Sequence, residues 1–89
     1  MKTRNPTPLQ IKAWDTLDAL TAENKIPPSM TDLMAETGTT STSVMKHRLD
    51  SGVRVGRIVG IPVRGGTKYV PAWWLRMVNE NVNKYYHAA

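Results

Sequence analysis

Small hydroxyl side chains and basic groups are interleaved between residues 41 and 48, in the stretch Ser-Thr-Ser-Val-Met-Lys-His-Arg. A hydroxyl both donates and accepts hydrogen bonds, and a lysine ammonium can reach the acceptor atoms on the edge of guanine. On a helix, Ser43, Lys46 and His47 share one face, because residues three and four apart are neighbours there. We interpret Ser41, Thr42, Ser43, Lys46 and His47 as candidate contacts to base edges in the major groove of double-stranded DNA. Ser41 also suits the cap of this helix, and both roles stay open for it.

The sequence offers little for catalysis or metal binding. It has no cysteine, and its two histidines, His47 and His87, have no carboxylate at a metal-ligand spacing. No constellation of partners surrounds His47 as a general base requires. Gly65-Gly66 is too short to be a phosphate-binding loop. We therefore expect no enzymatic activity, no metal site and no cofactor.

Charge is distributed unevenly along the chain. Residues 1–38 hold four basic and five acidic side chains, a net charge of −1, whereas residues 39–89 hold eight basic and two acidic ones, a net charge of +6. Six of those eight basic residues lie between Lys46 and Lys68. This placement favours a polyanionic partner. The alternative is a solubilising surface that binds nothing.

Length and composition indicate one globular domain. The chain has 89 residues, of which 40% are apolar, and this is too apolar for a disordered protein. The first ten residues, MKTRNPTPLQ, lack the apolar core of a signal peptide. No stretch approaches the roughly 18 apolar residues of a membrane span. We expect a cytoplasmic protein with no membrane contact.

A pair of helices is predicted to position the candidate contacts. Ser29 caps the first helix, and Gly38 suits the left-handed residue that ends it. Ser41 begins the second helix, which runs over about 41–51 and loosens near Ser51 because Gly52 lowers helix stability. Asp50 falls on the same outward face as Lys46. The inward faces are formed by Met30, Leu33 and Met34 of the first helix and by Met45, Leu49 and Val53 of the second.

The chain before this pair is predicted to support it. Thr7 and Gln10 can form a capping box around Pro8, which suits the first helical position, and the helix ends near Asn24-Lys25. Its apolar residues recur with the helical period and predict one buried face, made of Leu9, Ala13, Trp14, Leu17 and Leu20.

After the pair, residues 57–63 and 68–70 are predicted to be strands around a tight turn at 64–67. A two-stranded hairpin is marginal alone, so Ile58, Ile61 or Tyr69 must pack on the helices. The hairpin tip carries Arg64 and Lys68 without an acidic neighbour, and such a basic wing (64–68) suits DNA phosphates or the minor groove. The candidate contacts to the DNA backbone are Thr40, Arg48, Arg57, Arg64, Gly65, Thr67 and Lys68.

Pro71 opens a final predicted helix that runs from Ala72 to about Tyr86. Its apolar surface exceeds what a small three-helix domain needs for its own core. The helix therefore either packs back across the first helix or pairs with a second copy of the chain. The candidate dimer contacts are Trp74, Leu75, Val78, Val82 and Tyr85.

Several motifs occur together: Thr7-Pro8-Leu9-Gln10, Ile26-Pro27-Pro28-Ser29, residues 32–38, and residues 41–49, followed by Gly56 and Ile58. Over about residues 7–70 the chain thereby resembles the winged helix-turn-helix DNA-binding domain of the LexA repressor. The resemblance implies a three-helix core, a two-stranded wing and operator binding, and it adds Val44 to the base-facing positions.

Three departures limit the resemblance. Residues 42–47 differ in detail, so the family's operator sequence does not carry over. Gly52 replaces an expected apolar residue. The family continues into a self-cleaving peptidase domain, for which these 89 residues leave no room, so we expect no release by self-cleavage.

Together the patterns predict a fold that is mainly α with a small β-hairpin. We expect a winged helix-turn-helix over 7–70, a further C-terminal helix over 71–86, and flexible ends at 1–6 and 87–89. The favoured function is sequence-specific DNA binding by a small transcriptional regulator of the phage or mobile-element type, at the bacterial nucleoid, with repression favoured over activation.

The alternative function is a protein-interaction module that inhibits or modulates a host or phage protein. Its anchor would be the surface of residues 73–85, and it would bind DNA weakly and without sequence preference.

Overall fold

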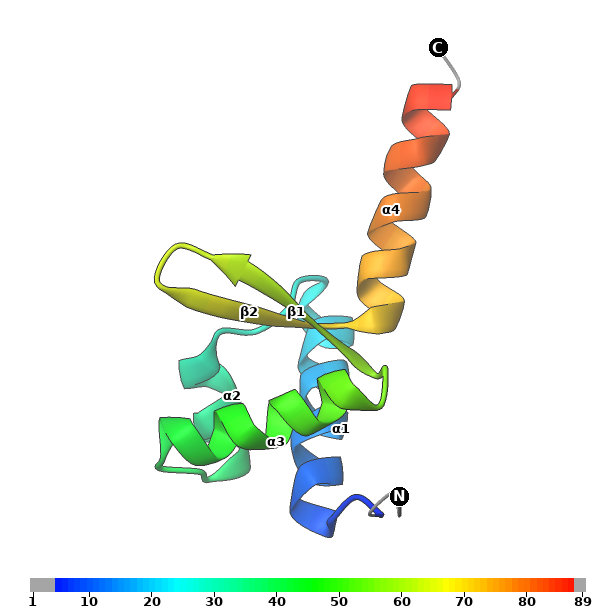
Figure 1. Ribbon diagram of the computed structural model, residues 1–89. Coiled ribbons are helices and arrows are strands. Elements are labelled where there is room, and N and C mark those ends of the chain that lie inside the picture. The colour runs from blue at the N-terminus through cyan, green and yellow to red at the C-terminus, as the bar shows by residue number, and fades with distance from the viewer. Residues whose placement is uncertain (1–4, 88–89) are drawn as a thin grey trace.

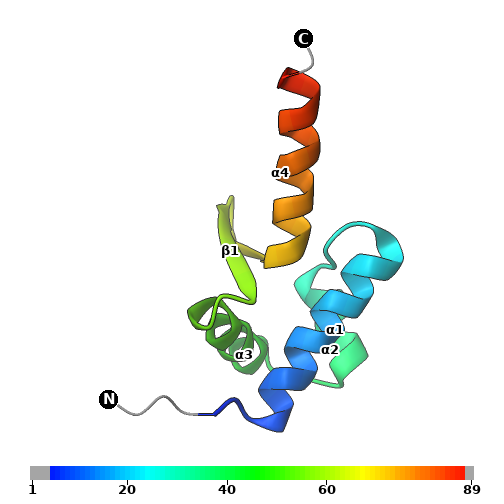
Figure 2. The same cartoon turned by 90° about the vertical axis from the view of Figure 1, so that its right-hand side faces the viewer.

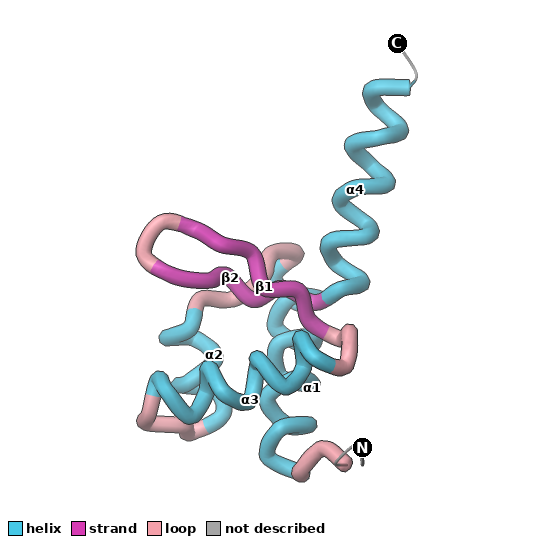
Figure 3. The backbone as a smooth tube through the Cα atoms, viewed as in Figure 1, coloured by secondary structure: helices cyan, strands magenta, loops and turns pink. Residues whose placement is uncertain are grey.

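The computed structural model describes residues 5–87, with side chains described up to Asn81. It is mainly helical with one two-stranded antiparallel hairpin, as predicted. Of the predicted flexible ends, 1–6 and 87–89, residues 1–4 and 88–89 lie outside the described residues, and His87 is the last residue of a helix. The elements in chain order are α1 (Pro8–Asn24), α2 (Met30–Thr37), α3 (Thr42–Arg54), β1 (Ile58–Val63), β2 (Gly66–Pro71) and α4 (Ala72–His87) (Figures 1 and 3).

The core lies where α1, α2 and α3 meet the base of the hairpin. Leu17, Met45 and Leu49 are fully buried there. Leu20, Met30 and Met34 are partly buried against this cluster. The whole cluster comprises Ala13, Trp14, Leu17, Leu33, Met45, Leu49, Ile58 and Tyr69. One small core thus holds the three helices and the hairpin together.

The three predicted helix starts are confirmed. Thr7 Oγ1 accepts a hydrogen bond from Gln10 N (3.2 Å), and the Gln10 side chain accepts one from Thr7 N (3.0 Å), which completes the capping box. The Ser29 hydroxyl accepts the Asp32 N–H and the Ser41 hydroxyl accepts the Val44 N–H, so they cap α2 and α3. Gly38 ends α2 with φ +71°, a left-handed conformation that favours glycine.

Two residues predicted to be inward are exposed, and α3 is longer than predicted. Leu9 is 55% exposed and Val53 is 37% exposed. Instead of ending near Ser51, α3 continues to Arg54, because Gly52 is packed tightly and does not fray. A Cβ at Gly52 would lie 2.5 Å from Ile58 Cδ1 and 2.8 Å from Trp14 Nε1. The missing side chain lets α3 approach α1 and β1 closely.

The hairpin leans on the helices through two of the three predicted residues. Ile58 and Tyr69 are buried, whereas Ile61 is only half-buried. The register pairs Ile58 with Pro71 and Val63 with Gly66, so the turn consists of two residues, Arg64-Gly65. Gly65 has φ +90° at this turn.

In contrast to the other elements, α4 projects away from the core (Figure 1). The Trp73 indole N–H donates to Asp18 Oδ1 (3.0 Å) and the Trp74 indole N–H donates to the Lys25 carbonyl (3.1 Å), which ties the first turn of α4 to α1. The radius of gyration is 14.3 Å, against about 12 Å for a compact chain of this length. The helix therefore does not pack back along α1. No described helix is long and apolar enough to cross a membrane.

Candidate nucleic-acid interface

The side of α3 that faces away from α1 is open (Figure 2). All six predicted base-contacting residues are exposed, and three of them, Ser43, Val44 and His47, line a shallow groove with residues at the start of α1. Neither Lys46 nor His47 makes a side-chain hydrogen bond or ion pair within the described part of the chain. The apolar side chain of Val44 is 42% exposed. The six residues are Ser41, Thr42, Ser43, Val44, Lys46 and His47.

Buried contacts on the opposite side hold α3 in place. Met45 and Leu49 are fully buried. The Trp14 indole N–H reaches into the notch at Gly52 and donates to the Arg48 carbonyl (2.8 Å). A helix fixed in this way presents its outward side chains from a rigid backbone, which recognition of base edges requires.

Some of the candidate hydroxyls also have internal roles. Ser41 Oγ accepts the Val44 N–H (3.3 Å) and so caps α3. The Thr42 hydroxyl points at Met34 Sδ (3.7 Å), a weak acceptor. Thr40 is exposed in the turn between α2 and α3. Capping engages only one side of a hydroxyl oxygen, so Ser41 can still donate to an outside acceptor.

Arg48 lies along the turn between α2 and α3. It is half-buried, and its Nη1 donates to Thr39 Oγ1 (3.1 Å). Arg48 therefore supports the turn, with part of its guanidinium left for an outside partner.

Ser51 makes a second set of polar contacts farther along α3. Its hydroxyl accepts hydrogen bonds from Gln10 Nε2 (3.1 Å) and from Arg54 Nη2 (2.9 Å).

Arg57 was predicted to contact DNA phosphates, and the structure engages it internally. Its Nη2 pairs with Asp18 (2.6 Å) and with Asp15 (3.2 Å), and its guanidinium lies 5.5 Å from the centre of a Trp14 ring. Partial burial lowers the pKa of Arg57, but the two carboxylates outweigh it and raise that pKa above its ordinary value. Arg57 thus joins β1 to α1, and two acidic neighbours neutralise its charge.

Lys68, a predicted contact to the DNA backbone, is also held internally. Its half-buried ammonium donates to the carbonyls of Pro28 (3.1 Å) and Pro27 (3.5 Å) in the α1–α2 connector. Proline carbonyls are uncharged acceptors, in contrast to the carboxylates that pair with Arg57. Arg64, Gly65 and Thr67 are exposed at the tip, as predicted.

An unpredicted hydrogen bond couples the hairpin to α3. The hydroxyl of buried Tyr69 donates to Asp50 Oδ1 (2.7 Å). Burial, and then the Asp50 carboxylate, raise the pKa of Tyr69 to about 12. Asp50 is half-buried and was predicted to face outward. This bond fixes the hairpin against α3, so both can face one partner together.

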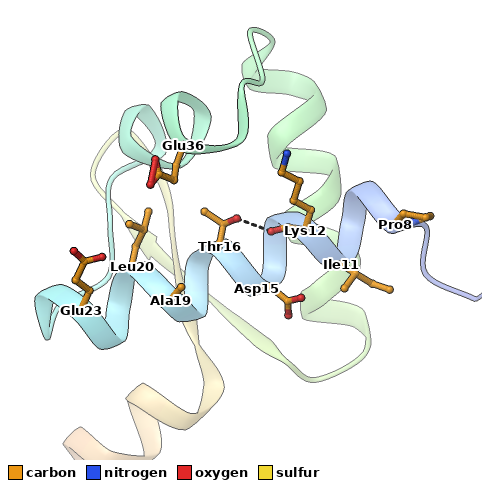
Figure 4. A pocket seen from close by; sticks show the side chains of 9 residues that line it. All are labelled: Pro8, Ile11, Lys12, Asp15, Thr16, Ala19, Leu20, Glu23 and Glu36. Carbon is orange, nitrogen blue, oxygen red and sulfur yellow. Dashed lines mark hydrogen bonds between the residues drawn. The ribbon is translucent and has the colours of Figure 1, made fainter.

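The outer face of α1 carries the opposite charge. A shallow groove there is lined by Lys12, Asp15, Glu23 and by Glu36 of α2, among apolar neighbours (Figure 4). Three carboxylates against one ammonium make this face unsuited to a polyanion. Within the described residues, no three His, Asp or Glu side chains gather in a way that could hold a metal ion.

The predicted dimer residues lie on the projecting helix. Trp74, Leu75 and Val78 are half-buried, whereas Met77 beside them is 44% exposed. The side chains of Val82 and Tyr85 lie outside the described part, although the α4 backbone extends through both positions.

Sequence reasoning missed four contacts that shape this surface. They are Trp14 with the Arg48 carbonyl, Tyr69 with Asp50, Arg57 with Asp15 and Asp18, and Lys68 with the connector carbonyls. Each joins residues between 19 and 42 positions apart in the sequence. Patterns of residue spacing within one helix or strand therefore could not predict these contacts.

Comparison with protein-family models, curated proteins and solved structures finds no significant match to this chain.

Proposed function

We propose that this protein binds double-stranded DNA sequence-specifically, with the outward face of α3 in the major groove and the hairpin tip on the phosphate backbone. The observation that carries the proposal is the open face of α3. It presents Ser43, Lys46 and His47 side by side, exposed and without internal side-chain partners in the described structure. Such groups can match the donors and acceptors on base edges.

The order of the elements supports the proposal. Two helices joined by the turn at residues 38–41 and followed by a hairpin correspond to a helix-turn-helix with a wing. This is the arrangement that the resemblance to the LexA DNA-binding domain implies. Of the basic residues, Lys46 on α3 and Arg64 at the tip are exposed on the proposed surface, while Arg57 is neutralised by carboxylates. A regulator of transcription is the role that such a small reader of DNA suits best.

The experiment begins with selection of bound DNA from a random pool, followed by fluorescence-anisotropy titrations of the selected duplex and a scrambled one. Lys46→Ala should reduce discrimination between them, by about 1–3 kcal/mol for a lost base contact. Arg64→Ala should weaken binding to both duplexes alike, because a phosphate contact carries no sequence information. Lys12→Ala is the matched control: it removes the same charge from the acidic face and should change neither. Equal binding by all three variants and the wild type would refute the assignment.

A second function is favoured by exposed apolar side chains beside α3. Leu9 and Val44 line a shallow, mostly apolar groove together with Gln10, His47 and Arg48. A protein partner could anchor there, and the chain would then be an interaction module. Salt dependence separates the two functions. A DNA reader releases counterions, so its affinity falls steeply as salt rises, whereas a module for proteins shows weak, sequence-blind DNA binding.

A further inference from the structure

The apolar side of α4 follows a heptad spacing. Leu75, Val78, Val82 and Tyr85 are separated by three, four and three residues, and the backbone is helical over all of them. This is the a–d–a–d pattern of a coiled-coil seam, which a helix buries against another helix. We call these four positions the α4 seam.

The base of α4 is fixed, and its backbone beyond the first turns stands apart from the other elements. Hydrogen bonds from Trp73 and Trp74 to α1 hold the first turn, and the helix then rises clear of the other elements (Figure 1). An unsupported helix of this length is marginal in water. Packing of the seam by a partner would supply the stabilisation that the rest of the described chain does not give.

The residues that flank the seam indicate what that partner is. Among the described side chains, the heptad positions beside the seam are Trp74, Asn79 and Asn81, all uncharged, and the two asparagines are exposed. The charged residues Arg76 and Glu80 lie on the far side of the helix, at positions that a partner helix does not reach. Charged flanks would select a partner and an orientation by charge complementarity, whereas neutral flanks place no like charges opposite each other when two identical helices pair. Neutral flanks beside an apolar seam therefore suit self-association.

We propose that α4 is a dimerisation helix whose seam packs against the α4 seam of a second copy of this chain. The proposal does not depend on DNA binding. Pairing through a projecting helix leaves the open face of α3 uncovered in both copies. If the proposed function also holds, the dimer would bind two half-sites related by two-fold symmetry.

The test is sedimentation velocity of the full chain without DNA, over a range of protein concentrations. The wild type should shift from the monomer mass to twice that mass as concentration rises. Val78→Glu and Val82→Glu should remain monomeric, because each buries a charge in the seam. Asn83→Glu adds the same charge outside the seam and should dimerise like the wild type. A wild type that stays monomeric, or a Val82→Glu variant that still dimerises, would overturn the proposal.

A second measurement keeps the proposal testable if the glutamate variants unfold. The chain has no cysteine, so single cysteines report contacts cleanly. Val78→Cys and Val82→Cys are oxidised separately and as a mixture. Parallel seams should cross-link each variant with itself, and antiparallel seams should cross-link only the mixture. Asn83→Cys should not cross-link. Absence of any cross-link at 78 and 82 would exclude the seam, and DNA binding by the monomer would still leave the proposed function standing.

Discussion

Helices α3 and α4 have similar lengths and each carries an apolar stripe, but the two stripes differ in how far they are buried. The stripe of α3 is fully buried at Met45 and Leu49, and its polar side is left open. In the described part of α4, the stripe residues Leu75 and Val78 are half-buried, and hydrogen bonds from Trp73 and Trp74 hold the first turn against α1. The comparison separates two kinds of surface: a polar one displayed by a rigid helix, and an apolar one displayed by a projecting helix.

This difference also indicates what each surface can bind. Hydrogen-bonding groups on a fixed backbone suit a partner with a fixed pattern of donors and acceptors, such as the edge of a base pair. An exposed apolar stripe gains most from burial against another apolar stripe.

A matched pair of methionines tests the burial contrast directly. Met45 on α3 is fully buried, whereas Met77 on α4 is 44% exposed. Met45→Ala should lower the free energy of unfolding by about 2–5 kcal/mol, because it leaves a cavity in the core. Met77→Ala should change it by less than about 0.5 kcal/mol. Urea denaturation followed by circular dichroism measures both, and equal losses would contradict the contrast.

The notch at Gly52 tests how closely α3 must approach α1. Gly52→Ala places a methyl group 2.5 Å from Ile58 Cδ1 and 2.8 Å from Trp14 Nε1. Overpacking of about 1–3 kcal/mol should exceed the gain of about 1 kcal/mol in helix propensity. We expect net destabilisation, measured by urea denaturation. Ile58→Val removes the clashing Cδ1, so it should lower the free energy of unfolding less in the Gly52→Ala variant than in the wild type. If the two losses of stability simply add, Ile58 does not limit the space at Gly52.

The Tyr69–Asp50 hydrogen bond tests the coupling of the hairpin to α3. Tyr69→Phe should cost about 1 kcal/mol of stability at neutral pH. Because the folded-state pKa of Tyr69 is raised to about 12, the unfolded chain ionises first. The stability of the wild type at this site is therefore complete below about pH 10 and is lost as pH rises towards 12. Thermal melts over pH 9–12 should fall more steeply for the wild type than for Tyr69→Phe, and parallel slopes would exclude this linkage.

Substitutions of Arg57 and Arg64 should distinguish a residue that stabilises the fold from one that binds DNA. Their expected effects on stability are the smallest of those considered. Arg57 pairs with two carboxylates and is partly exposed, so Arg57→Gln should lower stability by less than about 1 kcal/mol and leave DNA affinity nearly unchanged. Arg64→Gln at the hairpin tip should leave stability unchanged and lower affinity for every duplex. Melting curves and anisotropy titrations measure the two effects, and a large loss of affinity for Arg57→Gln would restore its predicted phosphate contact.

Local signals predicted the elements well. Caps at Thr7, Ser29 and Ser41 and the glycine at position 38 fixed the starts of three helices and the end of one, because capping depends on residues within four positions. The open face of α3 followed from its helical period in the same way. These features need only neighbours in the sequence.

Features set by distant contacts were not predictable from local spacing. In the sequence, Gly52 suggests the end of a helix. In the structure it lies inside α3, because the side chains of Trp14 and Ile58 occupy the space that a side chain at position 52 would need. Arg57 and Lys68 look like free cations, yet partners about 40 positions away engage them. Leu9 fits the helical period of α1 but is 55% exposed, beside a shallow groove that α1 forms with α3. A periodic pattern predicts which face of a helix a side chain lies on, but not which distant residues contact it there.

The most direct test of the central claim is a map of where DNA touches the protein. Amide chemical shifts of isotope-labelled protein would be followed by NMR during titration with the selected duplex. The account predicts shifts or broadening concentrated at residues 41–48 and at the hairpin tip, residues 64–67, with little change along the outer face of α1, residues 12–23. Perturbations centred on α1 or α4, or none at any residue, would contradict it.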